Sequence, residues 1–479
     1  MAEKLSEQQK VRNLYKIAGD RGLYVNTNFD VFSKEPEWIS LAFGGGYSLP
    51  LINEETHAYS SPLLFMTLTS LLNHGTMLLT GGPGLGKTTS SELSGPLFLG
   101  TSLEEVLSAE IQGHPQLTEE KMVASYDIGK LVHEGERVVI PTKFLECPVK
   151  IIDEGNRIPP DTLSILMKLV DTGKAIYGGK VLTAKPGPLF VTANYADEGN
   201  FTFTPPFLDR FDVAVMTTSP APWDLKKIRD RGDEKLNGNL ESLMIIPEKL
   251  KLDMQRIRKE IYALSQESEG EISAIEEFSD FVYSSLRFSE AASTSLSRAT
   301  KGNAWRINQD AFMGALPGHF TEAPFTYSLN ELTIRTMKSM PRYAKAFAWF
   351  NGDDKADISH LKTVMPYLLW HKLQPTEKAL AQNPHFHNDR IAFAQELIKQ
   401  IETEYAEYRS DDSLRKVYYP ALKVISDGKI GEQTYSEEQV RAITKNSIGK
   451  LGNIDKQWAI NLAHHLASEY NARYNGNKK

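Results

Sequence analysis

Cysteine is almost absent from this chain, because Cys147 is the single one among 479 residues. One cysteine excludes an intramolecular disulfide and any cysteine-rich metal site. Long apolar runs are also missing: the stretch 63–72 is interrupted by Thr and Ser and is too short to span a bilayer. Residues 1–10 lack the apolar core of a signal peptide. These absences predict a cytoplasmic protein without a membrane span.

The chain has no excess of positive charge, since 54 Lys and Arg residues against 61 Asp and Glu residues give a net charge of −7. This balance argues against a global nucleic-acid-binding surface, although a local basic groove would not show in the sum. A length of 479 residues exceeds one ordinary domain, so two to four hydrophobic cores are expected. An apolar content of 41% is typical of a globular protein.

The most informative stretch is GGPGLGKT at 81–88, which lies between the apolar run 76–80 and a helix-compatible segment at 89–93. The spacing G-x-x-x-x-G-K-T lets the backbone curl so that several N–H groups point at one phosphate, at the start of a helix. Lys87 is expected to reach the β- and γ-phosphates and Thr88 to hold Mg²⁺. The candidate nucleotide-binding residues of this stretch are Gly81, Gly82, Pro83, Gly84, Leu85, Gly86, Lys87, Thr88 and Thr89.

Two further apolar runs end in polar side chains. The run 148–154 ends in Asp153 and Glu154, and the run 188–194 ends in Asn194. Buried parallel strands end at one edge of a sheet, where open α/β folds bind their ligands. We therefore expect Asp153 to hold Mg²⁺ together with Thr88, Glu154 to polarise an attacking water, and Asn194 to contact a γ-phosphate and orient that water.

Arg210 stands just before an apolar strand at 213–216. An arginine in this position is usually part of a surface ion pair, but in a ring of subunits it would reach the nucleotide of a neighbour. Between the acidic run and Asn194, residues 175–182 predict a β-hairpin with Lys174, Lys180 and Lys185 on or beside it.

Helical patterns make up most of the remaining chain. Ser60, Ser61 and Pro62 predict the start of a helix that ends before 73–75, and a charged helix is expected to open at 246–248. Past a polar stretch at 376–389, apolar residues at helical spacing predict helices over 391–405 and 458–470. We divide the chain into a lead-in packed on the core (1–60), an α/β nucleotide-binding domain (61–220), an α-helical lid with an insertion near 290–327 (221–375) and a C-terminal α-helical domain (376–479).

The order GGPGLGKT, IIDEGNRIPP, hairpin, FVTAN and LDRFD resembles the AAA+ ATPases, and within them the MoxR group, which carries DE-x-NR-x-PP and LDRF segments. The resemblance covers roughly residues 45–375. It implies an α/β P-loop core with a central parallel sheet and an α-helical lid, with ATP and Mg²⁺ as ligands. It makes Asn194 the sensor 1 residue and Arg210 an arginine finger acting in trans, so it implies a ring homo-oligomer, commonly a hexamer.

The same resemblance implies further features. Residues 111–115, continuing through 118–121, occupy the place of the insertion that the group makes in its second helix. Arg335 falls where the family has its sensor 2 arginine, which would contact the nucleotide, but Thr333 and Ile334 replace the usual Ser-Pro, and Arg287 and Arg298 are rival candidates. The family commonly works with proteins that contain a von Willebrand factor A domain.

Three hypotheses follow for the function. The leading one is ATP hydrolysis coupled to the remodelling of a partner protein. The second is a DNA-dependent ATPase or helicase-like motor, because the hairpin and LDRFD also resemble the MCM helicases. The third is a nucleotide-gated scaffold with negligible turnover.

Overall fold

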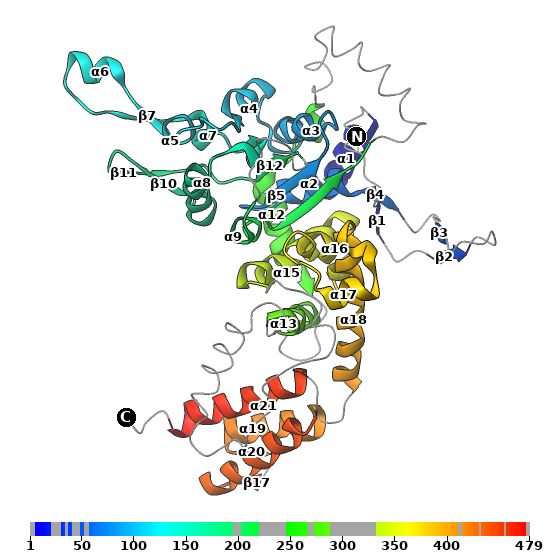
Figure 1. Cartoon of the computed structure of the whole chain (residues 1–479). Coiled ribbons are helices and arrows are strands. Elements are labelled where there is room, and N and C mark those ends of the chain that lie inside the picture. Colours follow the sequence, from blue (N-terminus) through cyan, green and yellow to red (C-terminus); the bar gives the residue numbers. More distant parts are fainter. Residues whose placement is uncertain are drawn as a thin grey trace. The chain divides into compact units, whose positions relative to one another are not determined.

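The computed structural model describes residues 5–20, 30–33, 37–40, 48–51, 57–194, 203–219, 246–266, 273–287, 332–410, 414–430, 433–454 and 457–475. The chain divides into two compact units (Figure 1). The first comprises Met1–Ile275 and Lys338–Leu368, and the second comprises Glu276–Met337 and Leu369–Lys479. The division into four segments proposed above stays a prediction. None of the described helices has the length and apolarity to cross a membrane.

A five-stranded parallel sheet forms the centre of the first unit, as expected, with the strand order β13-β5-β12-β9-β6. Its strands are rich in β-branched and other apolar residues, and the three inner strands are buried along most of their length, which is typical of a parallel sheet covered on both faces. Leu189 of β12 pairs with Thr76 of β5 and with Lys150 of β9, so these three strands begin level with one another. The strands are β5 (Thr76–Gly81), β6 (Ile111–Gln112), β9 (Lys150–Asp153), β12 (Leu189–Ala193) and β13 (Val213–Thr217).

Helices flank this sheet (Figure 1). Every residue of α2 is buried, because that helix packs against β5, β13 and its helical neighbours. Its N-cap position is Ser60, as expected, but the Ser60 side chain accepts no capping hydrogen bond. The helical elements around the sheet are α2 (Ser61–Leu71), α3 (Lys87–Ser94), the π-helical turn η1 (Gly95–Leu99), α4 (Leu103–Ala109), the 3₁₀ turn η2 (Gly155–Arg157), α8 (Pro160–Thr172) and α9 (Pro205–Leu208).

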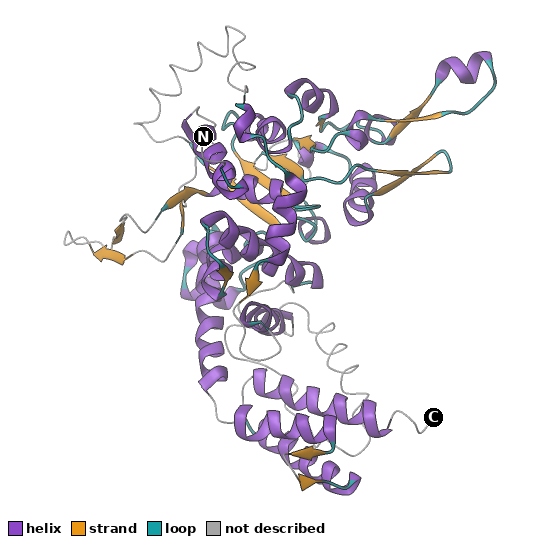
Figure 2. Ribbon diagram, turned by 180° about the vertical axis from the view of Figure 1, so that it is seen from behind, coloured by secondary structure: helices purple, strands orange, loops and turns teal. Residues whose placement is uncertain are grey.

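Two antiparallel hairpins extend side by side from this unit (Figure 2). The first joins β7 (Ala124–Tyr126) and β8 (Val139–Pro141) and carries α6 (Ile128–His133) at its tip, with α5 (Glu119–Met122) and α7 (Lys143–Glu146) at its base. The second joins β10 (Lys174–Tyr177) and β11 (Lys180–Thr183), which confirms the predicted hairpin. The rings of Tyr126 and Tyr177 lie 5.2 Å apart and hold the two hairpins together.

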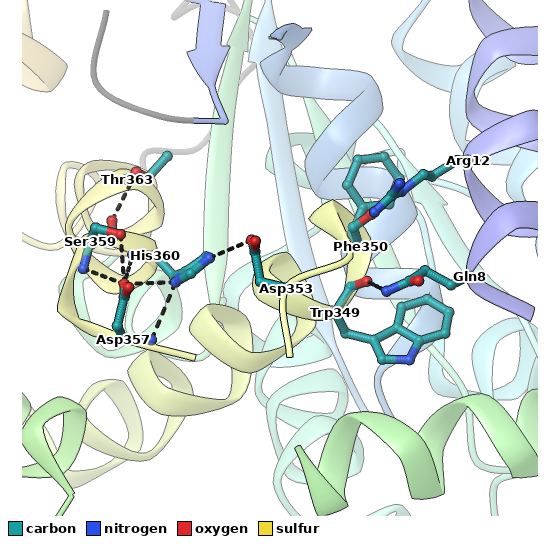
Figure 3. A network of polar contacts seen from close by, with 9 residues as sticks. All are labelled: Gln8, Arg12, Trp349, Phe350, Asp353, Asp357, Ser359, His360 and Thr363. Atoms are coloured by element: carbon teal, nitrogen blue, oxygen red, sulfur yellow. Dashed lines mark hydrogen bonds and ion pairs between the residues drawn. The ribbon is translucent and has the colours of Figure 1, made fainter. Parts of the chain in front are cut away.

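The N-terminal helix α1 (Glu7–Asp20) packs on the same unit through Val11 and Leu14, which supports the expectation of a lead-in packed on the core. Figure 3 shows how α1 meets the end of α15 (Ile334–Asn351): Gln8 donates to the carbonyl of Trp349, and Arg12 donates to the carbonyl of Phe350 at 2.5 Å. Both carbonyls belong to the last turn of α15, and that of Trp349 also accepts from the Gly352 amide at 3.2 Å. The cationic side chain of Arg12 stabilises this negative end of the helix.

The remaining described elements of the first unit surround this region. Contrary to the expected helix opening at 246–248, a 3₁₀ turn occupies Glu248–Leu250 and the helix begins only at Met254, where the Asp253 side chain caps it. The elements are η3 (Glu248–Leu250), α12 (Met254–Ala263), α16 (Ile358–Leu369) and the strand pairs β1 (Asp30–Phe32) with β4 (Ala58–Ser60), β2 (Glu37–Ser40) with β3 (Ser48–Leu51), and β14 (Ser265–Gln266) with β15 (Lys355–Ala356).

The second unit is mainly helical. Glu277 of α13, which is partly buried, accepts hydrogen bonds from Tyr405 and Tyr408 at 3.0 and 3.1 Å and pairs with Arg409 at 3.0 Å, which ties α13 to α18. The predicted C-terminal helices are present, and the polar stretch at 376–389 contains the short helix α17. The elements are α13 (Ala274–Arg287), α17 (Glu377–Gln382), η4 (Pro384–His387), α18 (Arg390–Ser410), η5 (Leu414–Tyr418), α19 (Tyr419–Asp427), β16 (Lys429–Ile430), β17 (Gln433–Thr434), α20 (Glu437–Gly452), α21 (Gln457–Tyr470) and η6 (Asn471–Asn475).

One expectation about the second helix of the family is wrong in part. Ile111 and Gln112 form strand β6 and pair with Ile152 and Asp153 of β9, so they belong to the central sheet and not to an insertion. The short apolar segment could join the sheet because Gly113 follows it and donates to the Asp153 carbonyl at 2.7 Å. The insertion predicted near 290–327 lies outside the described residues.

Candidate nucleotide-binding site

The loop 82–86 connects the end of β5 with the start of α3. Gly84 and Gly86 have φ values of 71° and 76°, a left-handed conformation that glycine adopts without strain. Gly81 lies so close to β13 that a Cβ atom there would stand 2.0 Å from Thr217 Oγ1. The loop therefore needs its glycines for two reasons, curvature and close packing. The loop ends at the N-terminus of α3, which is a favourable place for an anion.

Lys87 is buried at the first turn of α3, with 6% of its surface exposed. Its ammonium group donates to the carbonyls of Gly81 at 3.0 Å and Gly82 at 2.6 Å, and to Asn194 Oδ1 at 3.0 Å. Burial lowers the pKa of Lys87, and the carboxylates of Asp153 and Glu154 oppose that shift. The side chain is thus held at the mouth of the loop, where a phosphate would replace its present acceptors.

Asp153 ends β9 and lies beside the loop. Its Oδ1 atom accepts hydrogen bonds from the hydroxyl of Thr88 at 2.5 Å and from that of Thr192 at 2.6 Å. Hydroxyl and carboxylate oxygens are the ligands that Mg²⁺ prefers, and it usually keeps water and substrate phosphates as its other ligands. Burial, then the neighbouring carboxylates of Glu92 and Asp153, raise the pKa of Glu110 to about 8. The residues present therefore fit the predicted magnesium site.

Glu154 follows Asp153 in a strained backbone conformation, with φ 50° and ψ 46°. Its amide donates to Thr192 Oγ1 at 3.0 Å, which fixes this turn against β12. The carboxylate is held on both oxygens: Oε1 accepts from Asn194 Nδ2 at 2.8 Å, and Oε2 lies 3.0 Å from Arg157 NH1 and 3.4 Å from Gln112 Nε2. Asn194 therefore links Glu154 to Lys87, and the two expected catalytic groups meet at the predicted edge of the sheet.

Arg210 lies at the other edge of the sheet. Its carbonyl accepts from the hydroxyl of Thr76, the first residue of β5, at 2.8 Å, whereas the phosphate loop follows the last residue of that strand. At a rise of about 3.3 Å per residue, the two ends of β5 are about 16 Å apart. The guanidinium group donates to Asp171 Oδ2 from Nε at 3.1 Å and from NH2 at 2.8 Å. Arg210 is thus not part of the cluster that its own chain forms around Lys87.

The three sensor 2 candidates differ in what the structure describes. Arg335 is the second residue of α15 and is partly buried, and Arg287 is the last residue of α13. Both belong to the second unit, so the role of Arg335 as a nucleotide contact stays a prediction. Arg298 lies outside the described residues.

Two side chains at the site were not predicted from the sequence as functional, Thr192 and Gln112. The signal for Thr192 was a hydroxyl in an otherwise apolar buried strand, because a buried polar atom needs a partner. Gln112 gave no such signal, since β6 is two residues long. The sequence identifies Arg157 as part of the DE-x-NR motif but assigns it no partner. In the structure it forms an ion pair with the Glu154 carboxylate.

Comparison with known proteins agrees with this geometry. Residues 76–211 match the family model of the AAA domain (dynein-related subfamily). A crystal structure of a "putative ATPase" from Cytophaga hutchinsonii is similar over 81% of this chain and 96% of its own, with a TM-score of 0.53 and 18% sequence identity, which shows a shared fold. No curated protein matches the chain. The parallel sheet, the loop at its edge and the matched segment together identify residues 76–211 as an AAA domain.

Proposed function

We propose that this protein is an ATP hydrolase of the MoxR type that works as a ring oligomer and remodels a partner protein. The observation that carries the proposal is the convergence of Lys87, Asp153, Glu154 and Asn194 at one edge of the sheet, with Arg210 at the opposite edge. The first four supply the groups that phosphoryl transfer requires within one chain. The position of Arg210 supports a site that a second copy completes.

In the proposed reaction the loop amides and Lys87 bind the β- and γ-phosphates of ATP. Thr88 and Asp153 would hold Mg²⁺, which neutralises charge on the phosphates when it is bound. When a phosphate replaces Asn194 Oδ1 as the acceptor of Lys87, the Asn194 amide is free to rotate, and moving Nδ2 from Glu154 Oε1 lets it donate to the γ-phosphate. Glu154 Oε1 then accepts a proton from the water that attacks the γ-phosphorus, and ADP leaves with the electron pair of the broken bond.

Arg210 would act on the nucleotide of the neighbouring copy. Its guanidinium pairs with Asp171 of its own chain, and both side chains are partly exposed, so this ion pair orients Arg210 before assembly. Arginine fingers contribute about 10³ to 10⁵ in rate in related phosphoryl-transfer systems. A hexamer, a cytoplasmic location and a partner with a von Willebrand factor A domain belong to the same proposal and rest on the resemblance of the motifs.

Mixing two inactive variants tests the shared site. Glu154→Gln removes the base and Arg210→Ala removes the finger, so each protein alone should lose nearly all ATPase activity. If the finger acts in trans, a mixed oligomer contains interfaces that pair an intact Glu154 with an intact Arg210, and the mixture should regain measurable turnover. Two inactive variants that co-assemble by size-exclusion chromatography and show no regain would refute the trans assignment. Arg256→Ala, which breaks an exposed ion pair with Glu260, is the matched control and should keep full activity.

A DNA-dependent motor remains the second candidate because Lys174 and Lys180 are exposed on the β10–β11 hairpin. Exposed lysines on a projecting hairpin suit the tracking of phosphates along a strand. ATPase rates measured with and without single-stranded DNA at two salt concentrations separate the candidates. Strong stimulation that falls with salt favours the motor, and a rate independent of DNA favours the remodelling of a protein.

A further inference from the structure

Lys150 is a buried charged residue that the proposed reaction does not use. It is the first residue of β9, at the end of the strand remote from Asp153, and 6% of its surface is exposed. Its ammonium group donates to the carbonyl of Cys147 at 2.6 Å and to the carbonyl of Lys185. An ammonium group has three donors, and a buried charge costs free energy unless an opposite charge compensates it.

Besides burial, two described side chains act on the pKa of Lys150: Cys147 raises it and Lys185 lowers it. Burial followed by the charges of Arg342, Arg258 and Lys150 lowers the pKa of His74. Arg342 and Arg258 are held in place by the carbonyls of Asn73 and Leu71, at 2.7 and 3.4 Å. Burial lowers the pKa of Lys150 itself to about 8, so the group still carries its charge at neutral pH.

A cavity of about 50 Å³ lies against Lys150 at this edge of the sheet. Apolar side chains, among them Phe144, Leu166 and Leu169, form much of its wall, and His74, Thr76 and Lys185 complete its polar side. No aspartate or glutamate is among its described lining residues. One water molecule needs about 10 to 15 Å³ measured in this way, so the cavity has room for a few waters or for one small oxyanion.

We propose that this cavity binds a small oxyanion with the size and charge of inorganic phosphate or sulfate. Lys150 is its buried ligand, Lys185 is an exposed cation on the lining, and His74 offers an exposed imidazole. The bound anion supplies the negative charge that none of the described lining residues places beside Lys150. The site stands at the opposite edge of the sheet from Lys87, so it is separate from the phosphate loop and does not depend on the proposed function.

Isothermal titration calorimetry with inorganic phosphate tests the proposal, at constant ionic strength in a buffer without other small oxyanions and without nucleotide. The full chain carries Lys87→Ala in every sample, because the phosphate loop would otherwise bind the probe. This background should still bind phosphate in a saturable way with one site per chain. Adding Lys150→Met should weaken binding at least tenfold, while adding Lys168→Met, an exposed lysine on α8 that does not line the cavity, should leave the affinity unchanged.

Absence of saturable binding in the Lys87→Ala background would overturn the proposal, as would equal affinity with and without Lys150→Met. If Lys150→Met fails to fold by circular dichroism, the pair His74→Gln and Lys185→Gln takes its place, since both side chains are exposed. That pair should weaken phosphate binding about fivefold, and an unchanged affinity would equally overturn the assignment.

Discussion

Replacing Lys150 by methionine should change how the stability of the first unit depends on pH. The pKa of Lys150 lies at about 8 in the folded chain against an ordinary 10.5, chiefly because the side chain is buried. Between these two values the unfolded chain holds more protons than the folded one, so stability rises with pH in that window. Below pH 8 both states are protonated and the full penalty of the buried charge is present. Each unit of difference between the folded and unfolded pKa values corresponds to about 1.4 kcal/mol, so the cost of burying the charge is on the order of 3 kcal/mol.

Urea denaturation of the wild type and of Lys150→Met, followed by circular dichroism at pH 7, 8, 9 and 10, measures this term. The wild type should gain most of the 3 kcal/mol relative to the variant between pH 8 and 10, because methionine fills the same space without a charge. The two chains share all other titrating groups, which therefore cancel in the difference. Both are measured without phosphate or sulfate, since a bound anion would stabilise the charged form and flatten the curve. Parallel curves for the two proteins would show that the buried charge carries no such penalty, and Lys168→Met should give parallel curves in any case.

Three further predictions concern the site and its support. Arg157→Ala should lower ATP turnover several-fold with little change in KM, because the ion pair orients the Glu154 carboxylate without binding phosphate. The effect should be modest because the arginine side chain is 43% exposed. Steady-state kinetics checks this, and Arg157→Lys should recover part of the loss. Gly81→Ala should lower the melting temperature by several degrees, because the new Cβ would stand 2.0 Å from Thr217 Oγ1. Gly84 has free space around it, so Gly84→Ala should lower the free energy of unfolding only by the strain of its left-handed backbone, about 1 kcal/mol. Arg12→Ala should speed hydrogen exchange in α1, because Arg12 donates to the carbonyl of Phe350 (Figure 3) and its guanidinium lies against Gly352. Unchanged exchange would mean that the apolar face of α1 alone holds the helix.

The sheet and its loop could be predicted because their signals are local. A short apolar run followed by GGPGLGKT specifies a strand, a turn and a helix, and the structure has β5 and α3 there. Asp153 and Asn194 could be placed together because parallel strands end at one edge. The predicted start of α12 is wrong because Pro247 is equally suited to a 3₁₀ turn. The helix begins later, where the Asp253 side chain accepts a capping hydrogen bond from the Arg256 amide at 3.1 Å.

The environment of Lys150 could not be predicted, because it depends on segments that meet only in the folded chain. In the sequence, Lys150 is a polar residue at the start of a predicted strand, and a lysine in that position is ordinarily exposed to solvent. In the structure, carbonyls from Cys147 and from Lys185 approach its ammonium group from two different loops.

The turn that presents Glu154 depends on contacts of the same kind. A Cβ atom on Gly113 would stand 2.2 Å from the Glu154 carbonyl, and one on Gly155 would stand 2.5 Å from Val191 Cγ1. Because these two positions are glycines, β6 and β12 can pack against the turn from both sides. This packing holds the Glu154 backbone in the left-handed conformation, which a glutamate rarely adopts. The carboxylate can then move only by side-chain rotation, between its present bonds to Asn194 and Arg157 and a bond to water. The proposed base is thus restricted by the packing of Gly155, which directly follows the two acids, and the acids themselves do not reveal this.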